Sequence, residues 1–366
     1  MNQATDWSAL WQIDCQVTAC EHCNNAYLVP NSMGTVRCPA CQRDVLDPLE
    51  ADAEQMAYTQ PPEMVLGFAI DGERVVQQAL KFTNEIPLRP KDIQPTTLRQ
   101  RLQRVYLPVW LVDGEAQAEW KAEAGYFYEV VSHKEQLSGG QWRSREVKER
   151  RTRWEPRVGR LTRHYDNVPA PALERFAKIR RYLGIGNIAK ANGYTPDAVQ
   201  SAFVCLPDRS PADAWTEAVK GFQAGAAEDC RKAASADEIR EFHWAPDVEG
   251  QNWTQLLLPF YSTYYLDDDG EPRMIYVNGQ TGKIWGHRRA SQKRARTTAM
   301  ITIGAALLIF ILSLIAFVVA AAVPPVAVLG VVGLIAAVGV GVIGPMQLIR
   351  ASQFNKKYQG EWKFTL

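Results

Sequence analysis

Residues 299–349 form a continuous stretch without a single Asp, Glu, Lys, Arg or His side chain. A helix needs roughly 20 apolar residues to cross a bilayer core once, so this stretch is long enough for two crossings. Pro324 and Pro325 lie near its middle and lack the backbone N–H groups that a continuous helix uses. The sequence therefore predicts a transmembrane helical hairpin at residues 299–349, joined by a short uncharged turn at residues 320–328.

The residues that flank this stretch are basic and predict its orientation. Residues 287–296 precede it, and Arg350, Lys356 and Lys357 follow it. Lys and Arg side chains near span ends stay on the cytoplasmic side. The N-terminus has no basic region followed by an apolar core, so no signal peptide is expected. We therefore expect a membrane protein with both termini in the cytoplasm, including a tail at residues 350–366.

Two alternatives to a spanning hairpin stay open. The first is a buried core hairpin in a soluble fold, although soluble cores rarely need so long an uncharged stretch. The second is a re-entrant loop, which the two prolines and the glycine-rich second half would permit.

Four of the seven cysteines are spaced like metal ligands. Cys20 and Cys23 form one CxxC pair, Cys38 and Cys41 form another, and fourteen residues separate the pairs. Each pair places two thiolates on a tight turn, and two such turns supply the four sulfurs of a tetrahedral structural Zn²⁺. The spacing predicts a zinc ribbon at residues 1–46 that depends on its metal to fold.

The segment between the pairs predicts the hairpin of this ribbon. Residues 27–29 are expected as one strand, residues 31–34 as the turn and residues 35–37 as the return strand. A thioredoxin-like redox site is the alternative, but such a site uses a lone CxxC on a βαβ unit. His22 is expected to be a solvated bystander, and Cys15 an ordinary thiol unless it serves as a spare ligand.

Between the ribbon and the membrane segment the composition changes twice. Residues 47–62 are polar and acidic and end in two prolines, which is typical of a linker. Residues 63–286 then predict a cytoplasmic α+β body, and residues 287–298 form a basic juxtamembrane segment. The complete prediction is an α+β protein with an N-terminal zinc ribbon and a C-terminal two-helix transmembrane hairpin.

Two segments of the body resemble each other. Residues 105–114 and 257–270 are apolar, aromatic strands with an early proline, and each ends at an Asp-Gly turn signal. Helical patterns precede them at residues 74–84 and 211–234, so we predict two related helix-strand-strand units. The second strands of these units are expected at residues 118–131 and 274–277. The aromatic side chains expected in the core rather than in a ligand cage are Tyr106, Trp110, Phe260, Tyr261, Tyr264 and Tyr265.

Other local signals complete the body. Pro108 and Pro259 are expected at a strand start or sheet edge, because proline cannot donate to the ladder. Asn278-Gly279 predicts a two-residue hairpin turn. Residues 143–154 are strongly charged and are expected as a solvated strand or hairpin, with contact to anionic lipid or RNA as the alternative. Residues 173–192 predict a helix that breaks around its glycines.

No catalytic constellation is visible. The five histidines are scattered, without an HExxH pattern or a nucleophile elbow. Residues 267–269 resemble a metal-loop fragment but lack the distal Glu of an EF-hand, so an acidic turn is expected. Cys205 and Cys230 are expected as buried thiols. The chain is therefore not expected to be an enzyme, and its formal net charge of +1 argues against a dedicated nucleic-acid binder.

Together these patterns resemble a family of bacterial zinc-ribbon membrane proteins, which are often labelled zinc-finger or primosomal-helicase-like. The resemblance is carried by the CxxC…CPAC pairs, the strands YLPVWL and LPFYSTYY, the segment VNGQTGKIWG and the membrane hairpin. No Walker A loop is present, so the helicase label is not supported by this sequence. Relatives associated with phage-shock-type membrane-remodelling proteins imply a role in membrane stress or membrane recruitment.

The sequence predicts a membrane-anchored adaptor or scaffold that recruits cytoplasmic protein partners. The resemblance implies that it does so at the bacterial cytoplasmic (inner) membrane, with phage-shock-type membrane-remodelling proteins as possible partners. The alternatives are a membrane-surface enzyme acting on lipid or a small molecule, and a membrane tether for nucleic acid. Homo-oligomerisation through the hairpin is a further hypothesis, because glycines allow helices to pack closely. The glycines concerned are Gly330, Gly333, Gly339, Gly341 and Gly344.

Overall fold

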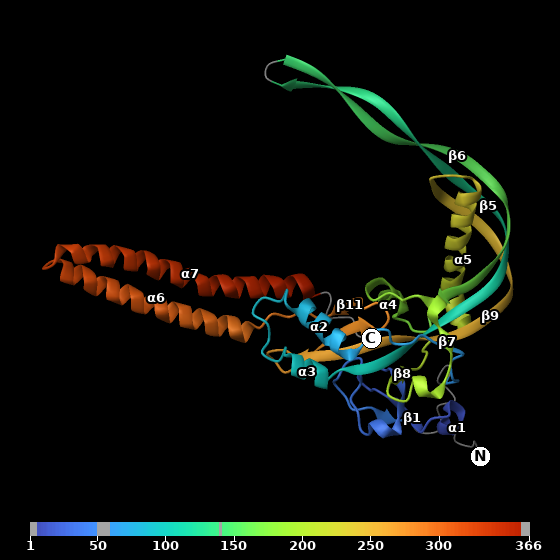
Figure 1. Cartoon of the computed structure of the whole chain (residues 1–366), viewed down its shortest axis with the longest axis horizontal. Coiled ribbons are helices and arrows are strands. Elements are labelled where there is room, and N and C mark those ends of the chain that lie inside the picture. Colours follow the sequence, from blue (N-terminus) through green and yellow to red (C-terminus); the bar gives the residue numbers. More distant parts are fainter. Residues whose placement is uncertain (1–5, 50–58, 139–140, 360–366) are drawn as a thin grey trace. The chain divides into compact units, whose positions relative to one another are not determined.

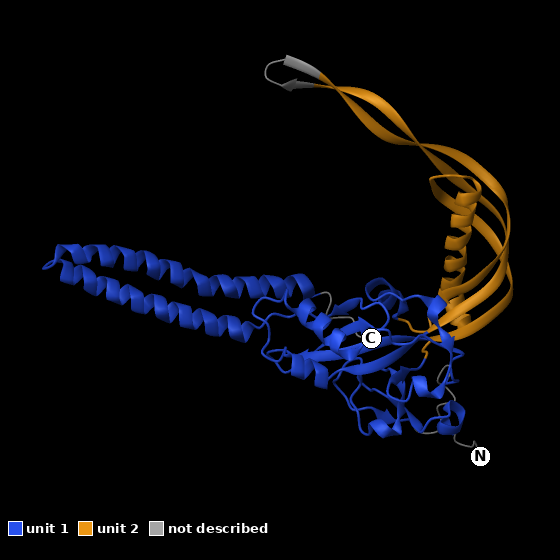
Figure 2. Ribbon diagram, in the orientation of Figure 1, with its two compact units in different colours: residues 1–108, 175–206, 257–366 blue, residues 109–174, 207–256 orange. Residues whose placement is uncertain are grey.

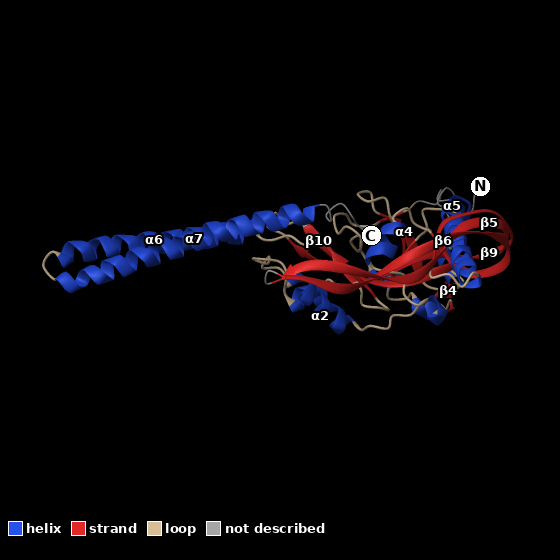
Figure 3. Ribbon diagram, turned by 90° about the horizontal axis from the view of Figure 1, so that it is seen from above, coloured by secondary structure: helices blue, strands red, loops and turns tan. Residues whose placement is uncertain are grey.

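The computed structural model describes residues 6–49, 59–138 and 141–359 of the chain. Helices and strands are mixed along it, which confirms an α+β architecture (Figure 3). Residues 50–58 of the expected linker and residues 360–366 of the expected tail lie outside the described residues. The other expected domain bounds stay a prediction.

The chain divides into two compact units (Figure 2). Unit 1 contains Met1–Pro108, Arg175–Leu206 and Leu257–Leu366, and unit 2 contains Val109–Glu174 and Pro207–Leu256. Two long strands, β5 (Gln103–Ser138) and β9 (Glu238–Leu266), run through both units.

Unit 1 is built on a sheet with short helices and the C-terminal helix pair (Figure 1). Its other strands are β1 (Cys15–Ala19), β2 (Ala26–Pro30), β3 (Asp47–Pro48), β4 (Met64–Val65), β7 (Asn192–Gly193), β8 (Phe203–Cys205), β10 (Pro272–Asn278) and β11 (Ile284–Gly286). Its helices are α1 (Trp7–Trp11), α2 (Gly72–Thr83), α3 (Pro95–Gln100), α4 (Phe176–Tyr182), α6 (Gln292–Ala320) and α7 (Ala327–Tyr358). The strand order is β11-β10-β9-β5-β8-β2-β1-β3, and β8 pairs with β5 in parallel.

The aromatic residues of the two apolar segments lie in the core, as expected. Tyr106, Phe260, Tyr261 and Tyr265 in unit 1 are buried, and so is Trp110 in unit 2. Tyr264 is the exception. It is half-buried, and the Arg101 guanidinium lies 4.5 Å from the centre of its ring.

The expected hairpin of the cysteine segment is wrong. β2 contains residues 27–29, but it pairs with β1 on one side and with β8 on the other. Residues 35–37 do not return along it, and Arg37 forms an isolated bridge with Val45 instead. The reason is that both edges of β2 are occupied: β1 pairs with it from Cys15–Pro30 to Ala19–Ala26, and β8 pairs with Tyr27 and Leu28 on the other side.

Two of the expected turns are also wrong. Asp113-Gly114 is an irregularity inside β5, which continues straight into the strand expected at residues 118–131. The hairpin of β10 and β11 exists, but its loop runs from Gly279 to Lys283, and the left-handed residue is Gly282 at φ +74°. The expected turn between Asp267 and Gly270 is confirmed, with Gly270 at φ +80°. The relation between the two helix-strand-strand units stays a prediction.

The two strand prolines lie inside long strands rather than at a strand start. Pro108 lies between the residues of β5 that pair with β8, which end at Tyr106, and those that pair with β6 (Gln141–Ala170), which begin at Trp110. Pro259 directly precedes the β10 ladder, which begins at Phe260. Both β5 and β9 are interior strands of the sheet, because they also neighbour each other, so the expected strand start or sheet edge is wrong for both prolines.

Unit 2 packs one helix, α5 (Pro211–Ala233), against strands of which β6 (Gln141–Ala170) is one. The expected N-cap is confirmed, since Ser210 accepts from the Asp213 N–H and Asp213 bonds back in a capping box. Ala214, Ala218 and Phe222 form the buried face of α5. The charged residues 143–154 lie in β6, in a long antiparallel hairpin with β5, which confirms the expected strand.

The helix expected at residues 173–192 is shorter than expected. α4 covers only Phe176–Tyr182, and a single 3₁₀ turn at Ile188–Lys190 follows. Gly184 and Gly186 lie between these two elements and have left-handed φ values of +71° and +77°, which a helix cannot continue through.

α6 and α7 form the expected apolar hairpin, joined by a 3₁₀ turn at Pro324–Val326 (Figure 1). Only 6% of the most apolar window of the first helix and 11% of that of the second are buried. A soluble core hairpin would bury these windows, whereas here they are mostly exposed. Two long, apolar, outward-facing helices are consistent with insertion into a membrane.

Small residues let the two helices approach closely. The buried positions of α7 are Gly330, Ala337, Gly344 and Ala351, which recur every seven residues. A Cβ atom at Gly330 would press on the Phe317 ring, and one at Gly333 would collide with Ser313. Most glycines that suggested homo-oligomerisation thus pack within the hairpin, and only Gly339 of that set has open space around its Cβ position.

Candidate metal centre and juxtamembrane network

The two CxxC pairs fold into turns of matching geometry. In the first, the Asn24 N–H donates to the Cys20 carbonyl at 2.8 Å, and in the second the Gln42 N–H donates to the Cys38 carbonyl at 2.9 Å. The residue after each second cysteine is left-handed, with φ +55° at Asn24 and +58° at Gln42. The same backbone path therefore presents both pairs of sulfurs inward.

The four sulfurs expected from the spacing are brought together. Cys20 Sγ lies 3.6 Å from Cys41 Sγ, and Cys23 Sγ lies 3.5 Å from Cys38 Sγ. All four Sγ atoms lie within 4.8 Å of one another, and three of the four residues are buried. A tetrahedral site with metal–sulfur bonds of about 2.3 Å requires sulfur separations of about 3.8 Å. The cluster therefore has the size and composition to bind a metal ion.

The neighbouring candidates lie outside this cluster. Cys15 is buried in β1, where burial and the carboxylates of Asp14 and Asp6 raise the pKa of its thiol to about 11. The Nε2 atom of His22 lies 3.1 Å from Arg43 Nη1, and His22 does not belong to the cluster of four cysteines.

The cysteine turns are hydrogen-bonded to the rest of unit 1. The buried Tyr276 hydroxyl of β10 donates to the Ala40 carbonyl, inside the second CxxC pair, at 2.6 Å. Gln42 Nε2 donates to Gln103 Oε1 of β5 at 2.8 Å, and Arg43 pairs with Glu271 at 3.0 Å. The cysteine cluster is therefore attached to the sheet of unit 1 through β10, β5 and the turn before β10.

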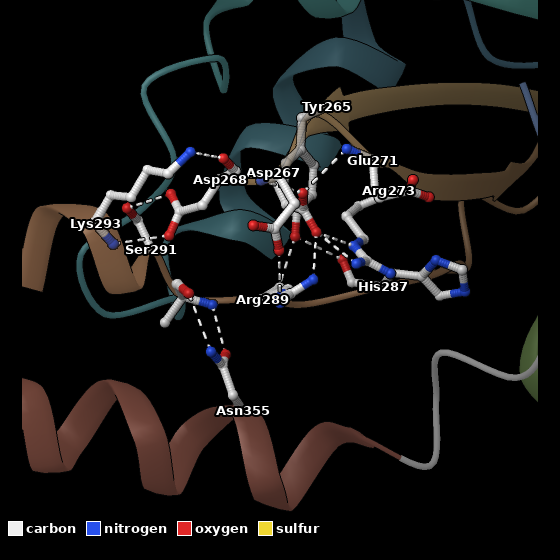
Figure 4. A network of polar contacts seen from close by, with 12 residues as sticks. Tyr265, Asp267, Asp268, Glu271, Arg273, His287, Arg289, Ser291, Lys293 and Asn355 are labelled. Atoms are coloured by element: carbon white, nitrogen blue, oxygen red, sulfur yellow. Dashed lines mark hydrogen bonds and ion pairs between the residues drawn. The ribbon is translucent and has the colours of Figure 1, made fainter. Parts of the chain in front are cut away.

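The acidic turn after β9 binds the basic segment before α6 (Figure 4). The side chain of Asp267 is 1% exposed, and its Oδ2 lies 2.5 Å from Arg289 Nη1 and 2.7 Å from Arg273 Nε. Its Oδ1 accepts from the N–H groups of Asp269 and Glu271 at 2.9 and 3.1 Å. One carboxylate thus links the turn, β10 and the juxtamembrane segment.

The pKa of Asp267 reflects this environment. Burial alone would raise the pKa of the carboxyl, but bonds from Arg273 and from backbone N–H groups outweigh it. The pKa of Asp267 therefore lies below its ordinary value, and the group stays ionised at neutral pH.

Asp268 holds the start of α6 itself. Its carboxylate accepts from Ser291 Oγ at 2.6 Å and from the Lys293 N–H at 2.8 Å. The other apolar helix, α7, is attached at the same place, because its Asn355 exchanges two hydrogen bonds with the Ala290 backbone at 2.7 and 3.1 Å (Figure 4). Both ends of the apolar hairpin therefore meet at this network.

The sequence correctly indicates an acidic turn at residues 267–269 but does not reveal its role. Opposite charge was the available signal, since an acidic triplet and a basic segment lie about twenty residues apart, but charge does not define partners. The acidic turn and the basic segment are brought together by β10, which pairs antiparallel with β9 and lies between Asp267 and Arg289 in the chain.

No protein-family model, curated protein or solved structure matches this chain.

Proposed function

We propose that this protein is a membrane-anchored scaffold whose four-cysteine centre holds Zn²⁺ and whose body recruits protein partners to the inner membrane. The observation that carries the proposal is the attachment of the cysteine cluster and of both apolar helices to one sheet in unit 1. A metal-stabilised body fixed to an apolar hairpin is suited to presenting a surface at a membrane.

Zinc is the metal that suits the donor set best. Four thiolates placed for tetrahedral coordination favour Zn²⁺ or iron over the hard cations that prefer oxygen ligands. Four protein ligands fill a tetrahedral site, so the ion would have no open position for water and would act structurally. The residues that would hold it are Cys20, Cys23, Cys38 and Cys41.

The hairpin supports anchoring with both chain ends on one side. Asn355 near the end of α7 is bonded to Ala290 before α6, so the polar ends of the two helices lie together. Basic residues surround these ends and none lies in the turn at residues 320–328. By the positive-inside rule the shared end would face the cytoplasm.

The surface best suited to a protein partner is the part of the β5–β6 hairpin beyond α5. Tyr128 and Val131 are 48% and 51% exposed there, and Tyr128 pairs in register with Arg151. The Arg150 guanidinium lies 3.6 Å from the centre of the Phe127 ring. Aromatic and arginine side chains dominate binding energy at protein interfaces. This two-stranded ribbon is therefore proposed as the recruiting surface.

The test is crosslinking in native membranes followed by purification of the full chain. The wild type is expected to retain a defined protein partner, and a Tyr128→Ala/Arg151→Ala variant is expected to lose it. Thr162→Ala, an exposed change elsewhere on β6, is the matched control and is expected to retain the partner.

Two results would contradict the proposal. A chain released from membranes by alkaline carbonate would not be anchored by the hairpin. A purified chain that hydrolyses or transfers phospholipid, and that retains no protein partner, would favour the enzyme alternative.

A further inference from the structure

A pocket of about 440 Å³ lies beside the first turns of α6. Its walls come from the turn at residues 90–92, from the acidic turn after β9 and from residues 291–298. All three segments belong to unit 1. Carboxylates, cations and hydroxyls all line the pocket. Whether it prefers an anion or a cation therefore depends on which of these charges are already compensated by a partner in the protein.

The carboxylates of the pocket are already engaged. Asp92 accepts from Arg101 at 2.5 Å and from the Leu266 N–H at 2.6 Å. Asp267 is paired with two arginines, and Asp268 accepts from Ser291 and from the Lys293 backbone. The charges of Asp92 and Asp267 are therefore compensated by arginines, whereas Asp268 keeps its negative charge because both of its partners are neutral.

The cations of the pocket are held differently. Lys293 Nζ donates to the Asp268 carbonyl, and Arg294 Nη1 donates to the Arg89 carbonyl. Both acceptors are neutral, and within the described residues neither cation forms an ion pair. Lys91 is exposed at the rim. The pocket therefore presents an excess of positive charge, which favours an anion.

The position of the pocket favours an anion of the membrane. Thr297 and Thr298 line it, and the uncharged stretch begins at the next residue, Ala299. A helix rises about 1.5 Å per residue, so Arg294 lies only about 7 Å before that stretch. This distance corresponds to the headgroup layer of a bilayer that the hairpin enters.

We propose that this pocket binds the phosphodiester of a phospholipid headgroup, with Lys91, Lys293 and Arg294 facing the phosphate and the threonine hydroxyls beside it. The inference depends on the proposed membrane anchoring and is independent of partner recruitment. A free phosphate shares the charge but lacks the acyl chains, which the adjacent apolar helices would contact.

Binding can be measured on the full chain purified and delipidated in detergent. Dihexanoyl-phosphatidylglycerol, titrated below its micelle concentration, is the lipid probe, and glycerophosphoglycerol and inorganic phosphate are the probes without chains. The wild type is expected to bind the lipid saturably and the chain-free probes much more weakly. Arg294→Gln is expected to weaken lipid binding about tenfold, as the loss of one charge-assisted bond predicts.

Arg296→Gln is the matched control. Arg296 carries the same charge on the same helix. It lies two residues after Arg294, which rotates it about 200° around the helix axis, and it does not line the pocket. Because Arg294 also supports the Arg89 loop, Lys91→Gln is the second test variant and should weaken binding without a change in thermal stability.

Three results would overturn the inference. Equal weakening by Arg296→Gln would mean that only the general charge of the helix attracts lipid. Inorganic phosphate that binds as tightly as the lipid would make this a site for soluble anions. Lipid binding that does not saturate would mean that the pocket is not a specific lipid site. Each result can occur whether or not the chain recruits a partner in membranes.

Discussion

The buried carboxylate of Asp267 is the side chain whose loss should damage unit 1 most. It is 1% exposed and is paired with Arg273 and Arg289, which are 12% and 25% exposed. Asp267→Asn would remove the buried carboxylate that Arg273 and Arg289 share, and Arg289 would retain its exposed pair with Asp269. Breaking a buried ion pair by removing one partner typically costs about 3–5 kcal/mol. In a domain of this size that loss lowers the melting temperature by on the order of 10 °C.

The assay is calorimetry of the full chain in detergent. Release of metal from the cysteine cluster, which lies in the same unit, identifies the transition that belongs to unit 1. Asp269→Asn is the control, because the Asp269 side chain is 60% exposed and makes one ion pair, with Arg289 at 3.1 Å. An exposed pair contributes about 0–1 kcal/mol, so this variant should melt within about 3 °C of the wild type.

The pH dependence provides a second check. The pKa of Asp267 is lowered in the folded chain, so its contribution is complete above the unfolded value of about 3.9 and is lost as the pH falls toward the folded value. The difference between wild type and Asp267→Asn should therefore be constant near neutral pH and shrink below about pH 4. If Asp267→Asn melts like Asp269→Asn, the carboxylate does not hold the network together and this reasoning fails.

Three further predictions concern the metal, the hairpin and a helix cap. Cys38→Ser should abolish the metal measured by atomic emission, whereas Cys15→Ser should retain it, and equal loss in both would contradict the assigned ligands. Gly333→Ile should destabilise the α6–α7 pair by about 1–3 kcal/mol in detergent unfolding, whereas Gly339→Ile should be neutral, and the reverse order would contradict the packing. Ser210→Ala should cost about 1 kcal/mol in urea unfolding and Ser210→Asp almost nothing, unless the capping box does not stabilise α5.

Features set by local pattern were predicted well from the sequence. The apolar hairpin follows from an uncharged stretch, and the cysteine cluster from two CxxC turns. α2 and α5 follow from helical patterns, and the start of α5 also from its capping residue Ser210. Each of these features depends on residues close together in the chain, so one sequence contains the whole signal.

Features that depend on pairing with other strands were not predicted from the sequence. Asp113-Gly114 has the composition of a hairpin turn, but the Asp113 carboxylate accepts from the Asn167 N–H of β6 at 2.6 Å, and β5 continues. The same holds for β2, whose partners β1 and β8 lie on either side of it in the sheet. A turn signal is only a preference, and a long partner strand overrides it by supplying hydrogen bonds on both sides of the irregularity.

The cysteine cluster and the two apolar helices are connected by contacts of unequal strength. Arg43–Glu271 is about half exposed on both sides, so this pair contributes little to their coupling. The Tyr276–Ala40 bond is buried, and losing it would leave an unsatisfied carbonyl, which costs about 1–3 kcal/mol. Tyr276 lies on β10, the strand that follows the acidic turn and precedes Arg289. A metal that orders residues 38–41 therefore also stabilises the strand on which the juxtamembrane network depends, so loss of metal should weaken the attachment of the body to its membrane helices.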